Sequence, residues 1–343
     1  MEIKLLKQLC EAPGLPGAED PVREIAISNL KEHTEEIKID ALGNVIAHIP
    51  GDGPRLLLDA HMDEVGFMVK HIDQRGFIRV IPLGGIDPRG FYGQRVVVWG
   101  KKPLVGMVAA LPPHIVNKER EKEAPEVEEC MIDLGLAPEK VSSLVKVGDV
   151  VSYFSPFIET EDAIISKAID DRVGIFVMLE ALKRKPRINC DLYVSATVQE
   201  EVGLRGANII VPTYEPDFAI ALEGTVSNDL PGVPEHKTLA KVGRGPEIRF
   251  TDKYLVADRA LSQFIIELAQ KREIPYQITV KKAGSTNATA LQVTGKGSRV
   301  TAVSVPVRYL HTPSCLAYKK DIEETINLTV AILEEIQYLN LKG

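Results

Sequence analysis

Five short segments of this chain each end an apolar run with side chains that can bind a metal ion. Together they supply two histidines and several carboxylates. This inventory suits two divalent ions that share one carboxylate and leave another free to act as a base. It predicts a metal-dependent hydrolase. The segments are residues 56–63, 168–172, 198–203, 219–223 and 308–313, and their candidate residues are His61, Asp170, Glu200, Glu201, Glu223 and His311.

The predicted chemistry explains why these residue types occur together. A water shared by two ions about 3.5–4 Å apart loses much of its proton affinity and becomes a nucleophile near neutral pH. A carboxylate that does not bind metal must then accept the proton and pass it to the leaving amine. Adjacent Glu200 and Glu201 can divide these tasks, because neighbouring side chains at a strand end point in different directions. Asp63 is well placed to accept a hydrogen bond from the second ring nitrogen of His61.

Each candidate also has an ordinary structural explanation when it is taken alone. Glu200 with Glu201 could form a solvated turn, Asp170 could cap a helix, and His61 could be a buried, hydrogen-bonded imidazole. Their joint occurrence at comparable positions favours one shared site. Three other histidines have no such neighbours and receive no role: His48, His71 and His236.

Composition limits the possible classes of protein. A length of 343 residues predicts two domains, or one domain with a large insertion. Hydrophobic residues make up 45% and charged residues 26%, which is typical of an ordinary globular protein. The net charge of -7 argues against a nucleic-acid partner. No apolar run approaches the ~20 residues that cross a bilayer, so we expect no membrane association.

The cysteines indicate the cellular compartment. They stand far apart, without the spacing of a disulfide framework or a zinc knuckle. Reduced thiols fit a cytoplasmic location, and the first residues lack the pattern of a secretory leader. The four are Cys10, Cys130, Cys190 and Cys315.

Apolar spacing predicts the elements that must position the candidate residues. Between residues 66 and 155, brief β-rich pieces separated by Gly and Pro predict a small inserted β-barrel or sandwich. On either side of it, strands and helices alternate, which predicts a layered α/β domain with helices on both faces of its sheet. Ligands collect beyond the carboxyl ends of strands in such sheets. The predicted strands are residues 44–49, 56–59, 191–198, 217–222, 276–280 and 299–305, and the predicted helices are residues 3–9, 22–30, 173–182, 261–269 and 322–339.

Four motifs resemble those of the tetrahedral, glutamyl and deblocking aminopeptidases, which are cytosolic co-catalytic metallopeptidases. The similarity covers essentially the whole chain. The motifs, in this order, are residues 59–66 (DAHMDEVG), 167–174 (KAIDDRVG), 199–207 (QEEVGLRGA) and 308–314 (RYLHTPS).

The resemblance implies a role for each candidate residue. Asp170 would bridge the two metals, with Glu201 and His311 completing one site and His61 and Glu223 the other. Glu200 would be the general base, and Asp63 would hold the imidazole of His61. It further implies a cis peptide bond between Asp170 and Asp171.

The resemblance also implies an architecture. Residues 1–65 and 162–343 would form a layered α/β/α metallopeptidase domain. Residues 66–161 would form an inserted, PDZ-like β-barrel domain that helps to build dimers and a tetrahedral dodecamer of identical subunits.

Two residues depart from the family pattern. Glu223 replaces the more usual aspartate, which lengthens the arm by one methylene but keeps the same donor atoms. Asn287 stands where many relatives carry aspartate. A neutral amide there would remove a negative charge near the expected cleft and change the substrate contacts.

The sequence therefore predicts a dinuclear aminopeptidase that removes N-terminal residues from peptides, with zinc or cobalt as the expected metals and manganese as a further option. Two alternatives stay open: a catalytically silent scaffold of the same fold, and an endoglucanase-type glycoside hydrolase, which needs two carboxylates but neither histidines nor metal. The preferred N-terminal residue depends on pocket walls, and we expect residues 84–93 and Asn287 to contribute to them.

Overall fold

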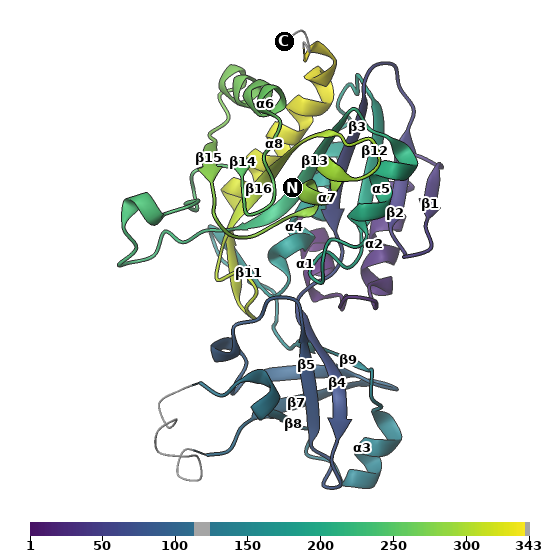
Figure 1. Ribbon diagram of the computed structural model, residues 1–343, viewed down its shortest axis with the longest axis vertical. Coiled ribbons are helices and arrows are strands. Elements are labelled where there is room, and N and C mark those ends of the chain that lie inside the picture. Colours follow the sequence, from purple (N-terminus) through teal and green to yellow (C-terminus); the bar gives the residue numbers. More distant parts are fainter. Residues whose placement is uncertain (113–123, 340–343) are drawn as a thin grey trace.

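Apolar runs in the sequence become the centre of a large mixed sheet in the computed structural model, which describes residues 1–112 and 124–339 (Figure 1). Four parallel strands form this centre. Their side chains alternate between two buried faces, so that Leu56 and Leu58 join one core and Leu57 joins another. The strands, in spatial order, are β12 (Asp191–Thr197), β3 (Arg55–His61), β13 (Phe218–Val226) and β16 (Arg299–Arg308).

Antiparallel strands extend the sheet on both sides. On one side lie β2 (Val45–Ile49) and β1 (Ile37–Ile39). On the other lie β17 (Cys315–Tyr318), β11 (Ala163–Ser166) and β10 (Ile158–Glu159). A branch pairs with β16 and consists of β14 (Glu247–Thr251) and β15 (Gln277–Val280).

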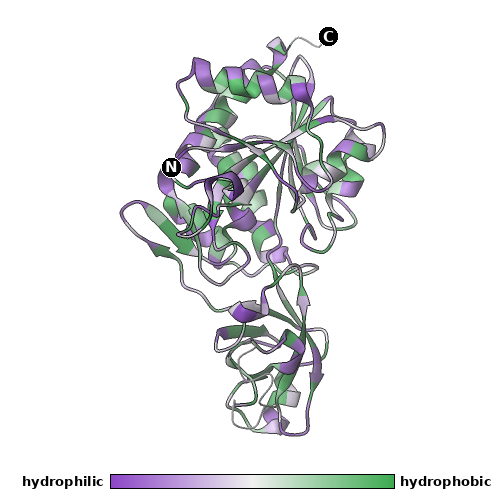
Figure 2. Ribbon diagram, turned by 60° about the vertical axis from the view of Figure 1, so that its left-hand side comes forward, coloured by the Kyte–Doolittle hydropathy of each residue, from purple (hydrophilic) through white to green (hydrophobic). Residues whose placement is uncertain are grey.

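Helices cover both faces of the sheet, as the sequence predicted. One core joins the strands to α1 (Ile3–Glu11), α2 (Asp20–Leu30), α4 (Ile169–Lys183), α6 (Arg259–Lys271) and α8 (Lys319–Glu335), which η4 (Ile336–Tyr338) follows. The opposite core contains α5 (Ala207–Tyr214) and α7 (Asn287–Val293). Hydrophobic and hydrophilic residues alternate along these helices (Figure 2), as expected of helices that bury one face.

The β-rich segment forms a closed antiparallel barrel below the sheet, which confirms the predicted inserted β-barrel. Phe67 and Phe91 pack in its core with ring centroids 4.1 Å apart. One strand of the predicted inserted range, β10, pairs instead at the edge of the main sheet. The barrel consists of β4 (Gly66–Ile72), β5 (Ile78–Leu83), β6 (Arg95–Trp99), β7 (Pro103–Ala109), β8 (Met131–Asp133) and β9 (Val150–Tyr153), with α3 (Pro138–Leu144), η1 (Pro88–Gly90) and η2 (Val127–Glu129) in its connections.

An ionic contact around His48 of β2 joins it to β12 and to the residue that precedes β1. The Nδ1 atom of His48 lies 2.8 Å from Oε2 of Glu36, and its Nε2 lies 2.7 Å from Oδ1 of Asp191. Burial alone would lower the pKa of His48, but hydrogen bonds to Asp191 and Glu36 raise it above its ordinary value. Both ring nitrogens can donate only in the charged form, so this contact favours the imidazolium.

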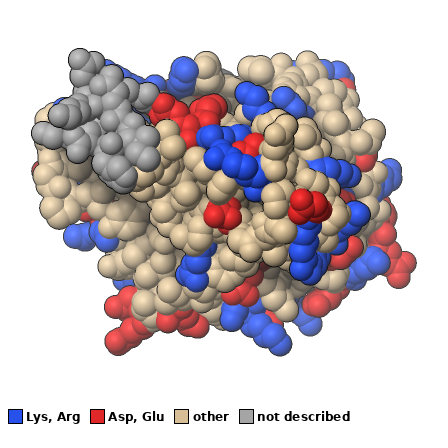
Figure 3. All heavy atoms as spheres, turned by 90° about the horizontal axis from the view of Figure 1, so that it is seen from below, with Lys and Arg blue, Asp and Glu red and all other residues tan. Residues whose placement is uncertain are grey.

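The surface carries charges of both signs. Seen from the barrel end, basic and acidic side chains are interspersed over the face (Figure 3). None of the helices in the described part of the chain is long and apolar enough to cross a membrane.

η3 (Glu235–Lys237) lies in the long connection between β13 and β14.

Candidate active site

The structure brings all six sequence-predicted chemical side chains together at the carboxyl edge of the parallel strands. His61 ends β3, and the adjacent Glu200 and Glu201 lie just beyond the end of β12. Asp170 is the second residue of α4, and His311 lies between β16 and β17. Glu223 lies inside β13 and not after it, because the strand continues through three further residues that pair with β16.

Asp170 faces the two imidazoles with its two carboxylate oxygens. Its Oδ1 lies 3.7 Å from Nε2 of His61, and its Oδ2 lies 3.4 Å from Nε2 of His311. Around His61, Nε2 also lies 3.8 Å from Oε2 of Glu223. Around His311, Nε2 lies 3.2 Å from Oε1 of Glu201. The arrangement has two centres of ligand atoms with one carboxylate between them.

The donor set fits divalent cations. Oδ1 of Asp170 and Oε1 of Glu201 are buried, yet neither accepts a hydrogen bond from any part of the chain that the structure describes. Such orphaned acceptors are rare unless an ion or water satisfies them. Three groups have ligand atoms within 4.8 Å of one another: Asp170 with Glu201 and His311, His61 with Glu200 and Glu201, and His61 with Asp171 and Glu223.

The electrostatics of the group point the same way. Burial would lower the pKa of His311, but Glu201 and Asp170 raise it to about 11. Burial likewise opposes ionisation of His61, while Asp170 and Asp63 raise its pKa well above its usual range. Burial raises the pKa of Glu223 to about 8. The carboxylates outnumber the positive charges available to them, and a cation would remove this imbalance.

The cis peptide bond expected between Asp170 and Asp171 is present. Asp171 is fully buried, and its carboxylate points at backbone groups: Oδ2 accepts from the amide of His61 at 3.0 Å and Oδ1 from the amide of Gly174 at 2.9 Å. The two neighbours therefore differ in use. Asp171 fixes the backbone of His61, while Asp170 keeps its oxygens free for the centre.

Asp63 holds the loop that carries the two glutamates. Its Oδ1 accepts from the amide of Glu200 at 2.9 Å, and its Oδ2 accepts from the amide of Glu201 at 3.0 Å. The nearest acceptor for Nδ1 of His61 is the backbone carbonyl of Asp63 at 3.1 Å, with the carboxylate at 3.5 Å. The residue thus contacts the imidazole chiefly through its backbone, because two amides already occupy its side chain.

A cleft of about 670 Å³ opens beside the two centres. Glu200 lines it, with its Oε2 3.9 Å from Nε2 of His61. Burial raises the pKa of Glu200 well above its ordinary value, and although His61 opposes this shift, the nearby carboxylates add to it. The wall also includes the cationic side chains of Arg249 and Lys281 and the apolar side chains of Leu204, Leu239, Tyr254 and Leu310.

A buried ionic cluster supports this wall. Arg249 donates to Oε1 of Glu247 at 2.9 Å and to Oδ2 of Asp252 at 3.1 Å, and Lys281 lies 2.6 Å from Oε2 of Glu247. Sequence reasoning missed these residues. The sequence feature that could have revealed them is the alternation of charged and apolar residues in β14, where Glu247 and Arg249 flank a core isoleucine.

Asn287 does not line the cleft, contrary to the sequence-based expectation. It is fully buried at the start of α7, and its Nδ2 donates to Oδ2 of Asp59 at 2.7 Å and to the hydroxyl of Thr197 at 2.8 Å. Its backbone amide donates to Oε1 of Glu223 at 3.3 Å. Burial raises the pKa of Asp59 to about 6, against the effect of its hydrogen-bond donors. Residues 84–93 are also absent from the described cleft lining.

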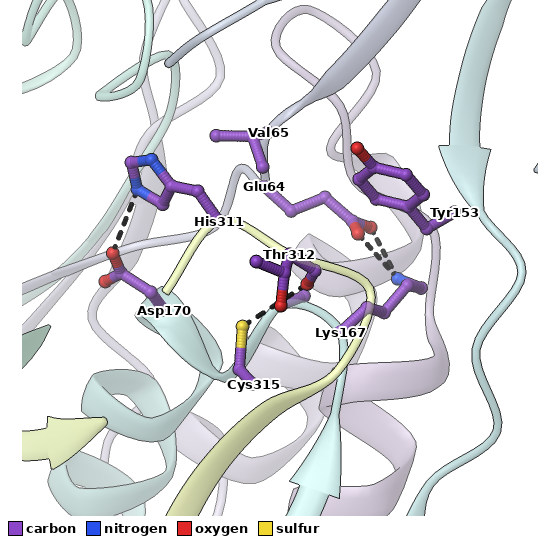
Figure 4. Close-up of a pocket in the computed structure, with 9 residues that line it drawn as sticks. Glu64, Val65, Tyr153, Lys167, Asp170, His311, Thr312 and Cys315 are labelled. Atoms are coloured by element: carbon purple, nitrogen blue, oxygen red, sulfur yellow. Dashed lines mark hydrogen bonds and ion pairs between the residues drawn. The ribbon is translucent and has the colours of Figure 1, made fainter. Parts of the chain in front are cut away.

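A second ionic group lies behind the centre, beside a small cavity that Asp170 and His311 also line (Figure 4). The ammonium of Lys167 lies 2.6 and 2.7 Å from the two oxygens of Glu64. The fully buried Arg172 donates to the carbonyl of Leu9 at 2.6 Å and approaches Glu64 at 3.4 Å. This group joins the segment after His61 to the segment around Asp170.

Comparison with known proteins supplies a family. A model described as M42 glutamyl aminopeptidase matches residues 43–328. A protein of Acetivibrio thermocellus named as a putative aminopeptidase is 35% identical over 95% of this chain and 96% of its own.

Solved structures agree with this match. The aminopeptidase APDkam598 from Desulfurococcus kamchatkensis has a TM-score of 0.95 and 35% identity, covering 99% of this chain and 97% of its own. The TET1 peptidase of Pyrococcus horikoshii, which can assemble into a tetrahedron or a large octahedral shell, has a TM-score of 0.87 and 33% identity, covering 97% of this chain and 99% of its own.

Proposed function

The chain belongs to the M42 glutamyl aminopeptidase family and is a hydrolase, and we propose that it removes N-terminal residues from peptides with two divalent metal ions. The proposed ligands are Asp170 between both ions, Glu201 and His311 at one, and His61 and Glu223 at the other. The observation that carries the proposal is the placement of the two Asp170 oxygens, 3.7 Å from one imidazole and 3.4 Å from the other.

Divalent ions in these positions would supply Lewis-acid polarisation of the scissile carbonyl and would lower the pKa of a water molecule. The side chains provide the remaining functions. Glu200 lines the cleft, and no backbone amide in the described structure donates a hydrogen bond to its carboxylate. In this proposal it accepts the proton and returns it to the leaving amine. Asp63 positions Glu200 through its backbone amide, and the cleft wall orients the peptide.

Replacement of Glu200 by glutamine tests the assignment. We expect kcat on aminoacyl chromogenic substrates to fall by about 10²–10⁴-fold, while the protein still binds two ions. The matched variant Glu201→Gln differs by one position and should instead weaken metal binding. Undiminished turnover in Glu200→Gln would reject its role as the base.

Removal of metal separates the alternatives. A chelator should abolish peptidase activity, and added zinc or cobalt should restore it, with manganese as a further candidate. A two-carboxylate glycosidase would keep its activity without metal. A silent scaffold would show no peptidase activity even with both ions bound.

We also propose that the chain forms homo-oligomers, with dimers assembling into a tetrahedral dodecamer. The assembly reported for the P. horikoshii TET1 peptidase supports this. In this proposal, residues 1–65 and 162–343 form the catalytic domain, and residues 66–161 form the dimerisation domain. A cytoplasmic location is proposed as well, supported by the four unpaired cysteines.

A further inference from the structure

The two imidazoles of the centre are held from different parts of the chain. Nδ1 of His61 lies 3.1 Å from the carbonyl oxygen of Asp63, two residues further on. Nδ1 of His311 lies 2.8 Å from the carbonyl oxygen of Gly85, 226 positions away in the connection between β5 and β6 of the barrel. When Nδ1–H donates to this carbonyl, the lone pair of Nε2 points toward Asp170 and Glu201.

The preceding residue, Gly84, lies against the other ligand of the same group. A Cβ atom at Gly84 would lie 3.2 Å from Cβ of Glu201 and 3.3 Å from its Oε2. Gly84 also has a φ of +87°, a backbone conformation that residues other than glycine rarely adopt. Glycine therefore lets the barrel connection approach Glu201 closely. The barrel touches both Glu201 and His311.

The other ligand group, His61 and Glu223, receives its support from helices that flank the main sheet. The backbone of His61 is fixed by Asp171, and Glu223 accepts from the backbone of Asn287. These two supporting residues belong to α4 and α7. The two groups thus differ in their dependence on the barrel.

The barrel is anchored next to the centre. The chain enters the barrel shortly after Glu64 and returns to the sheet through β10 and β11, which end just before Lys167. The ion pair between Glu64 and Lys167 links the segment that enters the barrel to the segment that leaves it, and Tyr153 of β9 lies beside the pair (Figure 4). Glu64 and Lys167 are 2% and 5% exposed, so water screens their attraction little. The ion pair therefore helps to fix the barrel, with the β5–β6 connection that carries Gly84 and Gly85, beside the centre.

We infer that the inserted barrel completes one of the two metal sites, the one formed by Glu201 and His311, and that its position sets the affinity of that site without setting that of the other. Gly85 is a positioning residue that acts through its backbone carbonyl, and Gly84 provides the close approach. This inference rests on the proposed dinuclear function. It makes the barrel a regulatory element of the centre as well as a fold unit.

A pair of glycine substitutions tests the inference. Gly84→Ala places a methyl group against Glu201 and displaces the Gly85 carbonyl. Gly93→Ala is the matched control, because it adds the same methyl group in the same connection at a φ of +78°, where no heavy atom lies within 4 Å. Stepwise zinc and cobalt affinities are measured by competition with a chelating indicator, and the cobalt absorption spectrum reports the ligand set.

In Gly84→Ala we expect the metal affinity of the site formed by Glu201 and His311 to fall by about 10–100-fold, which is the usual effect of losing a group that supports a metal ligand. The affinity of the other site should stay within a factor of about two. Gly93→Ala should match the wild type. The inference is overturned if both affinities of Gly84→Ala are unchanged, or if both fall together in a folded protein.

A folding failure of Gly84→Ala does not block the test. The new methyl group would lie 2.8 Å from Cγ1 of Val65, so the double variant Val65→Ala/Gly84→Ala removes that clash but keeps the contact with Glu201. The same two outcomes then decide. A wild-type protein that binds fewer than two ions would count against the proposed dinuclear function itself, which separates the two failures.

Discussion

Replacement of Asn287 should destabilise the protein through the buried carboxylate of Asp59. Asn287→Ala removes a hydrogen bond to a charged group, worth roughly 1.5–3 kcal/mol, and one to the hydroxyl of Thr197, worth roughly 0.5–1.5 kcal/mol. Asp59 would keep its hydroxyl partners Ser195 and Thr197. We expect the free energy of unfolding to fall by about 2–4 kcal/mol.

The variant Asn287→Asp gives the sharper outcome, because it introduces the aspartate that the family resemblance leads us to expect at this position. It keeps the shape of the side chain but replaces the Nδ2 amide group, which donates both hydrogen bonds, with a single carboxylate oxygen 2.7 Å from an oxygen of Asp59. An unsatisfied buried acceptor costs about 1–3 kcal/mol. At pH 8 this variant should therefore be less stable than Asn287→Ala.

Urea unfolding in excess chelator measures these differences without a contribution from metal binding. Thr289→Ala is the matched control in the same helix, since the hydroxyl of Thr289 contacts only that of Ser285, at 3.2 Å, among the described hydrogen bonds. Its effect should stay below about 0.5–1 kcal/mol. The reasoning is refuted if Asn287→Ala matches this control, or if Asn287→Asp is as stable as the wild type.

Two further predictions concern ionic contacts outside the cleft. Lys167→Met leaves the buried Glu64 with only two longer contacts among the described hydrogen bonds, from the guanidinium of Arg172 at 3.4 Å and the amide of Gly14 at 3.3 Å, so we expect a loss of about 3–5 kcal/mol in urea unfolding, and a loss below 1 kcal/mol would contradict the pairing. The pKa of His48 is raised in the folded protein, so its stabilising contact is fully present below the unfolded pKa of about 6.5 and is lost as pH rises through the folded value. The stability difference between wild type and His48→Gln should therefore shrink from pH 6 to pH 9, and a difference that grows with pH would reject the charged contact.

The sequence located most of the fold because its apolar runs are long and regular. The parallel strands around His61 and Glu223 are buried on both faces, so they appear as nearly continuous hydrophobic runs. Sequence patterns missed α5, α7 and β14. The first two are short, α5 contains Pro212, and β14 carries Glu247 and Arg249, whose charges disguise a strand until their pairing is known.

The sequence also supplied the chemical groups, because ligand types and their order along the chain are written in it. The resemblance assigned the metal-binding role to Asp170, but only the tertiary structure showed what Asp171 does, because its contacts with the backbone amides of His61 and Gly174 depend on backbone geometry and not on residue type. The tertiary structure likewise showed that Asn287 donates a hydrogen bond to Asp59 and does not line the cleft.

The contribution of Gly85 could not be read from the sequence at all. Every residue has a backbone carbonyl, and what distinguishes this one is its approach to His311 across 226 positions of the chain. The sequence thus determined which side chains could bind metal. The packing of the barrel against the sheet decided which backbone groups hold them, because such contacts depend on distance in space and not on residue type.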